Sequence, residues 1–352
     1  MHSVGIMTSV GWLTLFSLVL IERGSTAACA AEIPVADAIV ATDGSGDFTS
    51  IQEAISKAPM RTGRDDRRWV ILVKPGTYRE RVHVQRERGN ILVVGEDVAA
   101  TMLVFGLHAN HPSPDEEPIG TFRTPTLWLD GDGMEWRNIT IANDAGPVGQ
   151  ALALRVDGDR VVFRRCRFLG WQDTILVNRG RQYFVDCRIE GHVDFIFGAA
   201  TAYFDHCSIH CLGNGYITAA STPDGTPHGL VFADCTITGA EGVKTYLGRP
   251  WREFAKTVFL RTTMSDVVRR EGWHDWNKPE AHDTILYAEF ASAGPGGDAA
   301  GRVPWAVPLT AEAAAAMTPA AVLAGDDGWN PTVERWRPTS FRPGESGSGH
   351  HE

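Results

Sequence analysis

The sequence lacks an excess of basic residues and, beyond residue 31, any long hydrophobic run. Its 33 Lys and Arg are outnumbered by 43 Asp and Glu, which gives a formal net charge of -10. This balance argues against nucleic acid and an anionic membrane surface as main partners, and no later apolar stretch is long enough to span a bilayer. Hydrophobic residues still make up 43% of the chain. We therefore expect a folded, monomeric protein with a sizeable core.

The sequence also lacks the residue patterns of a serine triad and of a metal site. Neither Ser208 nor Ser221 lies in a G-x-S-x-G elbow, which argues against a serine nucleophile. The 12 histidines form no cluster with metal-ligand spacing, and about 20 residues separate most of the six cysteines, unlike a four-cysteine zinc site. We therefore expect no metal and no other cofactor.

Residues 1–31 differ from the rest of the chain. An uncharged apolar stretch at residues 10–20 is followed by small residues of A-x-A type around Cys29, a pattern typical of a cleaved signal peptide. The sequence thus predicts a secreted or periplasmic protein. A lipid-modified Cys29 is the alternative, although the residues before it lack the usual leucine. Residues 32–343 would then form the folded domain, and the polar residues 344–352 a disordered tail.

A short phrase recurs through the middle of the chain: an aromatic residue, a cysteine three places later and an apolar residue two places after that. Four copies begin at Phe163, Phe184, Phe204 and Phe232, so the period is roughly 20–28 residues. An earlier copy without the cysteine begins at Trp136, and a degenerate one begins at Phe259. Each phrase alternates apolar and polar residues, which predicts a half-buried strand.

A repeat of about 20 residues is too short for paired helices. It predicts an all-β, right-handed parallel β-helix, in which each coil stacks on the last and equivalent residues form ladders inside. A leucine-rich repeat is disfavoured because its leucine-asparagine pattern is missing, and a β-sandwich because few hairpin signals separate the strands. Helical spacing at residues 48–55 and an alanine-rich segment at 309–323 predict short helices that cap the open ends.

The cysteines of the repeat are expected to form one of these internal ladders. Cys187 and Cys207 are neighbours in it, one repeat apart. Because an exported protein can keep disulfides and adjacent coils bring such residues close together, we predict a disulfide between them.

Two aspartates occupy the same place in consecutive coils. Asp173 follows Cys166 by seven residues, and Asp194 follows Cys187 by seven. Adjacent parallel strands lie about 4.8 Å apart, so the two carboxylates should lie one above the other. The same count places Asn214 and Gly242 in the next two coils, which limits the carboxylates to a pair.

Such a pair tends to hold a proton where an isolated acid would be ionised. One carboxylate can then act as a nucleophile and the other as an acid, as an esterase without a serine requires. The alternative is that both are solvated turn residues. The shared register of Asp173 and Asp194, with Gln172 beside the first, favours catalysis.

Six segments occur in order between residues 40 and 330. They are Asp43-Gly44-Ser45-Gly46 with Phe48, Gly76-Thr77-Tyr78-Arg79-Glu80, Gln150-Ala151-Leu152-Ala153-Leu154-Arg155, Gly170-Trp171-Gln172-Asp173-Thr174, Asp194-Phe195-Ile196-Phe197-Gly198 and Leu247-Gly248-Arg249-Pro250-Trp251. Any one would be a weak signal, but together and in this order the sequence closely resembles the pectin methylesterase (pectinesterase) family.

This resemblance implies a parallel β-helix enzyme that hydrolyses methyl esters of homogalacturonan, giving pectate and methanol through a two-aspartate covalent mechanism. It implies Asp194 as the nucleophile and Asp173 as the acid that protonates methanol and then activates water. Gln150 and Gln172 would hold the oxyanion of the tetrahedral intermediate. Arg249 would pair with Asp194 and keep it ionised.

For substrate contact the resemblance implies Trp251, stacked on a galacturonate ring, together with Trp171 and Phe195 beside the catalytic segments. Two residues depart from the family's pattern: Trp171 replaces a phenylalanine or tyrosine, and His192 replaces a threonine. His192 is either a solvated turn residue or a contributor to the pH optimum or substrate contact. Three tryptophans are candidates for the groove or for packing: Trp171, Trp273 and Trp276.

Three other functions remain open at the level of sequence. The aspartate pair would serve a relative adapted to another ester or a thioester. A β-helix polysaccharide lyase is a second alternative, but such lyases usually use calcium and a basic residue. A catalytically inactive carbohydrate-binding protein is the third, and the intact pair of aspartates argues against it.

Overall fold

The computed structural model describes residues 1–2, 35–60 and 67–333. The predicted signal peptide, except for its first two residues, and the predicted tail lie outside these ranges. Among the described residues, no helix is long and apolar enough to cross a membrane. The fold described below is that of the compact unit that starts at residue 34.

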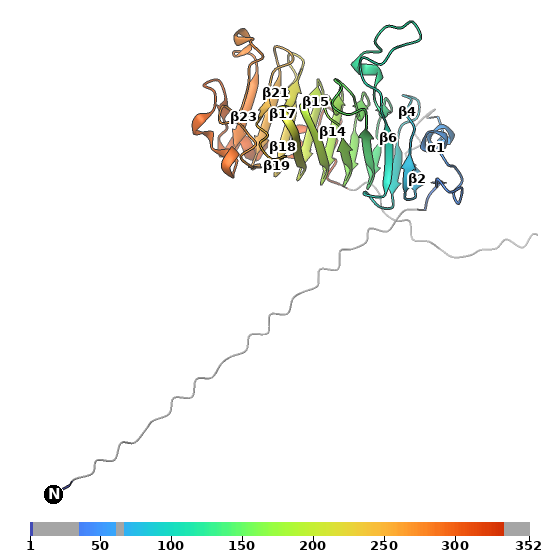
Figure 1. Ribbon diagram of the computed structural model, residues 1–352, viewed down its shortest axis with the longest axis horizontal. Helices are drawn as coiled ribbons and strands as arrows, with labels where there is room; N and C mark the ends of the chain where they lie inside the picture. Colours follow the sequence, from blue (N-terminus) through green and yellow to red (C-terminus); the bar gives the residue numbers. More distant parts are fainter. Residues whose placement is uncertain (3–34, 61–66, 334–352) are drawn as a thin grey trace, which may run out of the picture. The chain divides into compact units, whose positions relative to one another are not determined.

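The strands stack into a parallel β-helix, as the repeat predicts (Figure 1). One face is a sheet of 11 strands in which each strand pairs with its equivalent in the next coil. In spatial order these strands are β1 (Ala38–Val40), β2 (Trp69–Val73), β5 (Ile91–Gly95), β8 (Glu135–Arg137), β11 (Val161–Arg164), β14 (Arg181–Val185), β16 (Thr201–Asp205), β18 (Leu230–Ala233), β21 (Lys256–Leu260), β23 (Leu286–Phe290) and β24 (Val307–Pro308).

A second sheet of 13 strands makes two further rows. One row holds β3 (Gly76–Tyr78), β6 (Thr101–Phe105), β9 (Thr140–Asn143), β12 (Arg167–Leu169), β19 (Thr236–Gly239) and β22 (Thr263–Met264). The other holds β4 (Val82–Val84), β7 (Leu127–Leu129), β10 (Leu154–Val156), β13 (Ile175–Val177) and β20 (Thr245–Gly248). The long strands β15 (Arg188–Gly198) and β17 (Ser208–Ala220) belong to both, because their first halves pair in one row and their second halves in the other.

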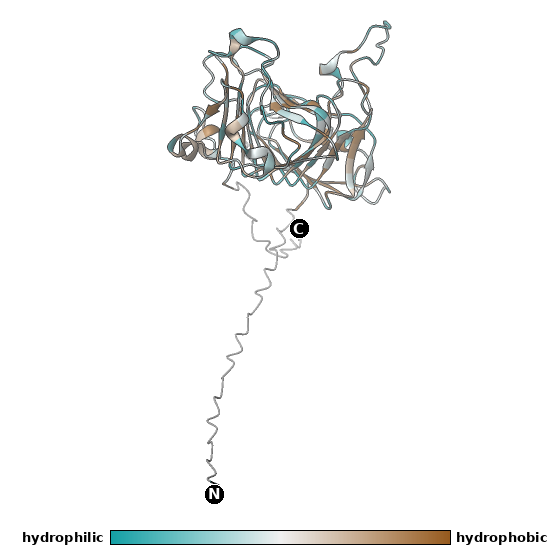
Figure 2. Ribbon diagram, turned by 60° about the vertical axis from the view of Figure 1, so that its left-hand side comes forward, coloured by the Kyte–Doolittle hydropathy of each residue, from teal (hydrophilic) through white to brown (hydrophobic). Residues whose placement is uncertain are grey.

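The recurring aromatic residues form a continuous stack inside the coils. Equivalent rings pair in register and lie face to face, with centroid distances of 4.7, 4.6, 4.5 and 4.5 Å along Phe163, Phe184, Phe204, Phe232 and Phe259. Trp136 pairs in register with Phe163, as its earlier copy of the phrase predicts. Figure 2 shows hydrophobic residues concentrated on the strands and hydrophilic ones on the projecting loops.

The cysteine ladder is present, but the predicted disulfide is wrong: Cys187 and Cys207 are both buried free thiols. The Cys187 thiol donates to the carbonyl oxygens of Phe163 and Val185, at 3.6 and 3.4 Å. The Cys207 thiol does the same one coil later. Both thiols are thus hydrogen-bonded to backbone carbonyls within the ladder. Burial, together with the neighbouring Cys187 and Cys235 thiols, keeps the pKa of the Cys207 thiol well above its usual range.

The predicted N-terminal cap is confirmed as α1 (Ile51–Lys57). The Ser50 hydroxyl accepts a hydrogen bond from the Glu53 amide at 3.2 Å, so Ser50 is the N-cap. Ile51 and Ile55 are buried and pack on the N-terminal end of the core. Figure 1 shows α1 at that end of the β-helix.

The predicted C-terminal helix forms as two short helices, α2 (Ala311–Ala316) and α3 (Pro319–Val322), but it is not a cap. Both pack on the outer face of the 11-stranded sheet, where the Tyr203 hydroxyl donates to the Met317 carbonyl at 3.0 Å. That outer face carries Tyr183, Tyr203 and Val231, which would otherwise be exposed. Ring-bearing residues close the C-terminal end instead: Tyr287 of β23 and, outside the strands, Trp273, His282 and Trp305.

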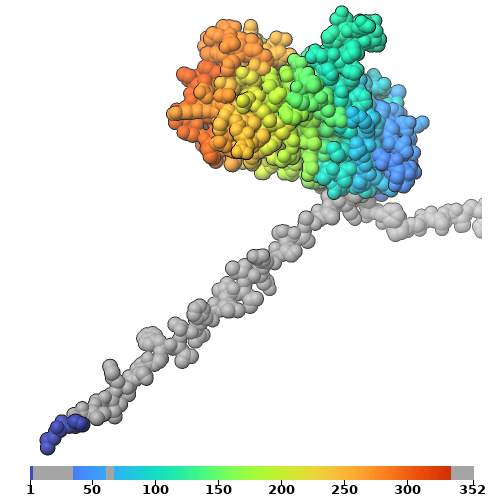
Figure 3. All heavy atoms as spheres, viewed as in Figure 1, coloured from blue at the N-terminus to red at the C-terminus, as the bar shows by residue number. Residues whose placement is uncertain are grey.

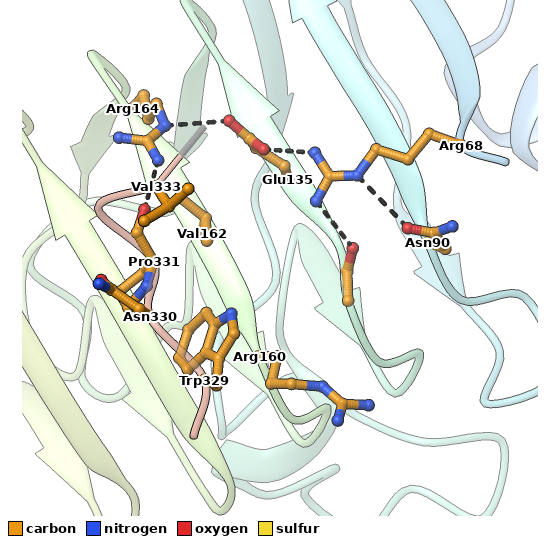
Figure 4. Close-up of a pocket in the computed structure, with 11 residues that line it drawn as sticks. Arg68, Asn90, Glu135, Arg160, Val162, Arg164, Trp329, Asn330, Pro331 and Val333 are labelled. Carbon is orange, nitrogen blue, oxygen red and sulfur yellow. Dashed lines mark hydrogen bonds and ion pairs between the residues drawn. The ribbon is translucent and has the colours of Figure 1, made fainter. Parts of the chain in front are cut away.

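The segment after α3 continues across a polar cluster on the same outer face (Figure 4). Glu135 on β8 is buried among Arg68, Arg137 and Arg164, and Arg164 also donates to the Pro331 carbonyl at 2.7 Å. Burial alone would raise the pKa of Glu135, but Arg68 and Arg137 lower it to about 2. The cluster is thus a buried ionic network without an unpaired carboxylate, and we assign it to structure.

Candidate active site

The two aspartates lie in adjacent coils at the same register, as the sequence predicts. Ile175 of β13 pairs with Ile196 of β15, which places Asp173 opposite Asp194, and the Asp173 amide donates to the Val193 carbonyl at 3.0 Å. Both residues have left-handed backbone conformations, with φ of 63° and 50°. Such angles are uncommon outside glycine and mark a locally constrained backbone that fixes where the carboxylates point.

The next coil departs from the predicted register. Gly191 of β15 pairs with Cys211 of β17, but Val193 pairs with Tyr216, so β17 carries extra residues at this point. Asn214 is therefore exposed, away from the position opposite Asp194, and its side-chain oxygen accepts from the Lys244 amide at 2.8 Å. The expectation for Asn214 is wrong, because equal counting from each cysteine misses a bulge.

Arg249 holds Asp194 through a bidentate ion pair. Its Nε and Nη2 donate to the two carboxylate oxygens at 2.9 and 2.6 Å. The guanidinium lies between two aromatic rings, 3.8 Å from the centroid of Tyr216 and 3.7 Å from that of Trp276. Arg249 itself is positioned directly after β20, where its amide donates to the Thr218 carbonyl at 3.0 Å. This combination of planar fork and stacked faces is available to arginine and not to lysine.

The two carboxyl groups differ in their electrostatic environments. Burial, together with the neighbouring Asp194 carboxylate, raises the pKa of Asp173 to about 8. Burial also raises the pKa of Asp194, but the hydrogen bonds and charge of Arg249 oppose that rise. Near neutral pH Asp173 is therefore mainly protonated, and Asp194 is the carboxylate that ionises first.

Gln150 and Gln172 lie next to the aspartates, one above the other in consecutive coils. The two residues form a parallel backbone bridge, and the Ala151 amide donates to the Gln172 carbonyl at 3.1 Å. Both side chains line the same cleft as Asp173 and Asp194. Two amide groups are thus available beside the carboxylate pair to donate hydrogen bonds to a developing negative oxygen.

The carboxylates are at the floor of a cleft of about 400 Å³ with aromatic walls. Asp173 and Asp194 are only 8% and 7% exposed, whereas Phe122 on the wall is 45% exposed. The residues that line the cleft are Thr121, Phe122, Gln150, Gln172, Asp173, Asp194, Phe197, Ala219, Arg249, Trp251 and Trp276. Figure 3 shows two projections, teal for residues near 115 and orange for residues near 275, that rise on one side of the β-helix with a lower surface between them.

Two of the aromatic residues expected to contact substrate, Phe195 and Trp171, do not line the cleft, and Trp273 takes the packing alternative. Phe195 is 0% exposed inside the core, so the prediction that it contacts substrate is wrong. Trp273 is likewise buried in the core. Trp171 does not line the cleft; its ring packs edge-on against His192 at a centroid distance of 5.5 Å.

Two aromatic residues of the cleft were missed by sequence reasoning, Phe197 and Phe122. Alternation counted from the buried Ile196 places Phe197 on the outer face, where its ring lies 5.7 Å from that of Trp251. Phe122 lies in the 3-10 segment Thr121–Arg123, between β6 and β7, and no repeat or motif marks it. Trp251 and Trp276, in contrast, lie on the cleft wall as considered from the sequence.

Attack on an ester carbonyl needs a nucleophile, an acid for the leaving group and donors for the oxyanion, and the cleft brings such groups together. The fold and site fit the class of β-helix hydrolases in which a carboxylate performs the attack.

The pectinesterase family model matches residues 37–326, and the chain belongs to the pectinesterase family. It is 40% identical over 273 residues to Pectinesterase 31 of Arabidopsis thaliana, a match that covers 76% of this chain and 85% of that protein. The relatives named pectinesterase/pectinesterase inhibitor from tomato and peach are longer, and the chain spans 51% and 53% of their length.

Solved structures of pectin methylesterases have folds similar to that of this chain. The pectin methylesterase from carrot superposes with a TM-score of 0.77 at 34% identity, over 83% of this chain and 94% of that one. A pectin methylesterase in complex with a hexasaccharide superposes with a TM-score of 0.72 at 30% identity, over 85% of this chain and 99% of that one.

Proposed function

We propose that the chain hydrolyses the methyl esters of homogalacturonan in pectin, giving free carboxylates and methanol. The observation that carries this proposal is the asymmetric carboxylate pair: Asp194 is clamped by Arg249, while Asp173 beside it retains a proton. Membership of the pectinesterase family supports the ester chemistry. The similarity to a pectin methylesterase that binds a hexasaccharide supports an oligosaccharide in the cleft.

In the first half of the reaction, the ionised Asp194 attacks the ester carbonyl carbon. The carbonyl oxygen becomes an oxyanion that accepts hydrogen bonds from the amides of Gln150 and Gln172. A donor of this kind is worth about 2.7–4 kcal/mol in a comparable esterolytic site. The intermediate collapses, the bond to methoxide breaks, and Asp173 gives its proton to the departing oxygen. The products are methanol and an anhydride between Asp194 and the galacturonate.

In the second half, Asp173 is a carboxylate and acts as the base. It takes a proton from a water molecule, whose oxygen attacks the galacturonyl carbon of the anhydride. The bond to Asp194 breaks, which restores the Asp194 carboxylate and leaves Asp173 protonated for the next cycle. The pKa of Asp173, about 8, allows one group to serve both as acid and as base near neutral pH.

The aromatic walls are proposed to bind the sugar rings. Trp251 and Phe122 stand on the wall of the cleft, and a ring face can stack on the apolar face of a galacturonate methyl ester. The chain's net charge of -10 disfavours fully de-esterified, anionic polymer and suits neutral, esterified stretches.

The reaction type can be tested with highly methylated pectin in the presence of a chelator. We expect methanol and free acid in equal amounts, no loss of chain length and no new ultraviolet absorbance. A lyase would shorten the polymer and generate unsaturated ends, a thioesterase would leave pectin untouched, and a binding protein would do neither. If folded protein releases no methanol between mildly acidic and mildly alkaline pH, the proposal is wrong.

We also propose that the enzyme is exported as a monomer, with residues 1–31 removed as a signal peptide and residues 32–343 as the catalytic domain. The small residues around Cys29 are the observation that supports this. N-terminal sequencing of the protein recovered outside the cytoplasm should begin close to residue 32, and size-exclusion chromatography should give a mass near that of one chain. Retention of residues 1–31, or a lipid on Cys29, would refute cleavage by this route.

A further inference from the structure

The rings of Tyr216 and Trp276 form an aromatic clamp around the Arg249 guanidinium. One of these two residues, Trp276, lies in a loop that is far from Arg249 in sequence. The second ring of the clamp belongs to Trp276, which has a left-handed backbone conformation with φ of 58°, as does Asn277 with φ of 55°. A bulky residue rarely adopts such a conformation unless its surroundings fix it. Whatever holds the backbone of Trp276 therefore also determines whether its indole can cover Arg249.

One side chain holds that backbone directly. The Trp276 amide donates to Nδ1 of His274 at 2.9 Å, which closes a turn of the Asx type with histidine in place of asparagine. The His274 amide donates to the Gly248 carbonyl at 3.1 Å, so the turn is attached to the residue before Arg249.

The His274 imidazole is itself fixed by two tyrosines. Its ring lies edge-on to Tyr216 and Tyr246, at centroid distances of 5.6 and 5.4 Å, and the two tyrosines stack on each other at 5.4 Å. Tyr216 is also the first ring of the clamp on Arg249. His274 thus touches one face of the clamp with its ring and fixes the other through Nδ1.

We propose that His274 is a positioning residue for the esterase reaction: as a neutral hydrogen-bond acceptor it holds Trp276 over Arg249, and through Arg249 it keeps the Asp194 carboxylate aimed. The inference rests on the proposed function, because it assumes that Asp194 is the nucleophile. His274 does not touch the substrate or the reacting atoms in this scheme.

The hydrogen bond makes this device sensitive to pH. Nδ1 accepts a hydrogen bond only when it carries no proton, so protonation of the His274 ring and this hydrogen bond exclude each other. Protonation would turn the acceptor into a donor that faces the Trp276 amide, and the turn would open. The titratable and charged groups around it are Tyr216, Tyr246, Arg249, Arg269 over the Tyr246 ring, Lys278 over the Trp276 ring, and the adjacent Asp275 with its partner His282. Protonation therefore adds a charge next to several cations and loosens the clamp.

The decisive variant is His274→Asn, because an asparagine oxygen can accept the same hydrogen bond from the amide two residues on but does not titrate. We expect its kcat for methanol release to lie within about twofold of the wild type at pH 8, since the retained hydrogen bond keeps the turn closed. The ratio of its kcat at pH 5.5 to that at pH 8 should be several times higher than in the wild type. His274→Ala should lower kcat about fivefold at pH 8 with little change in KM.

His206→Asn is the matched control, because His206 is a largely exposed histidine bonded to Asp205 and does not line the cleft. It should leave both kcat and the pH profile unchanged. If His274→Asn has a pH profile that superposes on the wild type, or if only KM changes in either variant, the inference is wrong. Thermal melting identifies an alanine variant that fails to fold, in which case the asparagine variant alone decides. A wild-type protein that releases no methanol would overturn the proposed function instead, so the two failures are distinguishable.

Discussion

Replacing Arg249 with lysine keeps the charge but removes the geometry that fixes the nucleophile. Two charge-assisted hydrogen bonds to Asp194, at 2.9 and 2.6 Å, would become at most one. The interaction energy that holds the Asp194 carboxylate should fall by about 1.5–3 kcal/mol. Loss of the planar faces stacked on Tyr216 and Trp276 should remove about 0.5–1 kcal/mol more. Together these amount to about 2–4 kcal/mol, or roughly a 30- to 1000-fold lower kcat if they act on the transition state.

The same substitution should move the pH profile in a defined direction. Arg249 opposes the burial that raises the pKa of Asp194, so a weaker partner lets that pKa rise further. Because the active enzyme needs Asp194 ionised, the acidic limb of kcat/KM should move to higher pH. Both effects are measured by methanol release at several pH values and pectin concentrations.

A matched control is available in Arg261, which makes a bidentate pair with Asp234 at 2.8 and 2.6 Å on the exposed surface and does not line the cleft. Arg261→Lys should leave kcat within about twofold of the wild type, because exposed ion pairs are worth at most about 1 kcal/mol. An Arg249→Lys enzyme with unchanged kcat and a raised KM would show that Arg249 binds substrate and does not align Asp194.

Four further outcomes follow from the structure. Asp194→Asn should reduce methanol release to below a few per cent while the melting temperature stays close to that of the wild type. In the wild type, kcat/KM should fall as the pH rises above about 8, where Asp173 loses its proton, and a plateau to pH 10 would contradict its role as the acid. Phe204→Ala should lower the free energy of unfolding by about 3–5 kcal/mol in urea titrations, because the ring is fully buried in the aromatic stack. The folded-state pKa of Glu135 is depressed, so its ionised form adds stability that is present above pH 4.5 and is lost as the pH falls towards 2. Glu135→Gln should remove this contribution. If the variant and the wild type unfold with the same midpoint in an acid titration, the reasoning is refuted.

The repeat in the sequence was sufficient to predict the β-helix and the carboxylate pair. The spacing of Phe163, Phe184 and Phe204 reports one turn of the coil directly, because equivalent residues must stack to bury their rings. The same counting failed at Asn214, where β17 holds extra residues and no local pattern reveals where the bulge falls. It also failed for the bridge between Cys187 and Cys207, since neighbouring thiols in a ladder can stay reduced and hydrogen-bond to backbone carbonyls instead.

Neither the C-terminal cap nor the position of Phe195 could be read from local patterns. A short alanine-rich helix covers whichever apolar surface it meets, and here the outer face of the 11-stranded sheet offers Tyr183 and Tyr203. Phe195 follows a residue with a left-handed backbone, so the alternation of the strand restarts there and the ring turns into the core. In both cases the outcome depends on backbone angles and surfaces that the amino-acid pattern does not specify.

The chemical difference between the two aspartates originates outside the repeat that places them. Asp173 and Asp194 are the same residue at the same register, and burial acts on both in the same direction. A partner from a later coil distinguishes them: Arg249, 55 residues beyond Asp194, donates hydrogen bonds to the Asp194 carboxylate and to no oxygen of Asp173 among the hydrogen bonds of the described residues. A repeat can therefore set the spacing of a catalytic pair, whereas assigning nucleophile and acid requires a contact that breaks the symmetry of the repeat. For that reason the aromatic rings around Arg249, as well as the two carboxylates, are where substitutions should alter turnover without altering the fold.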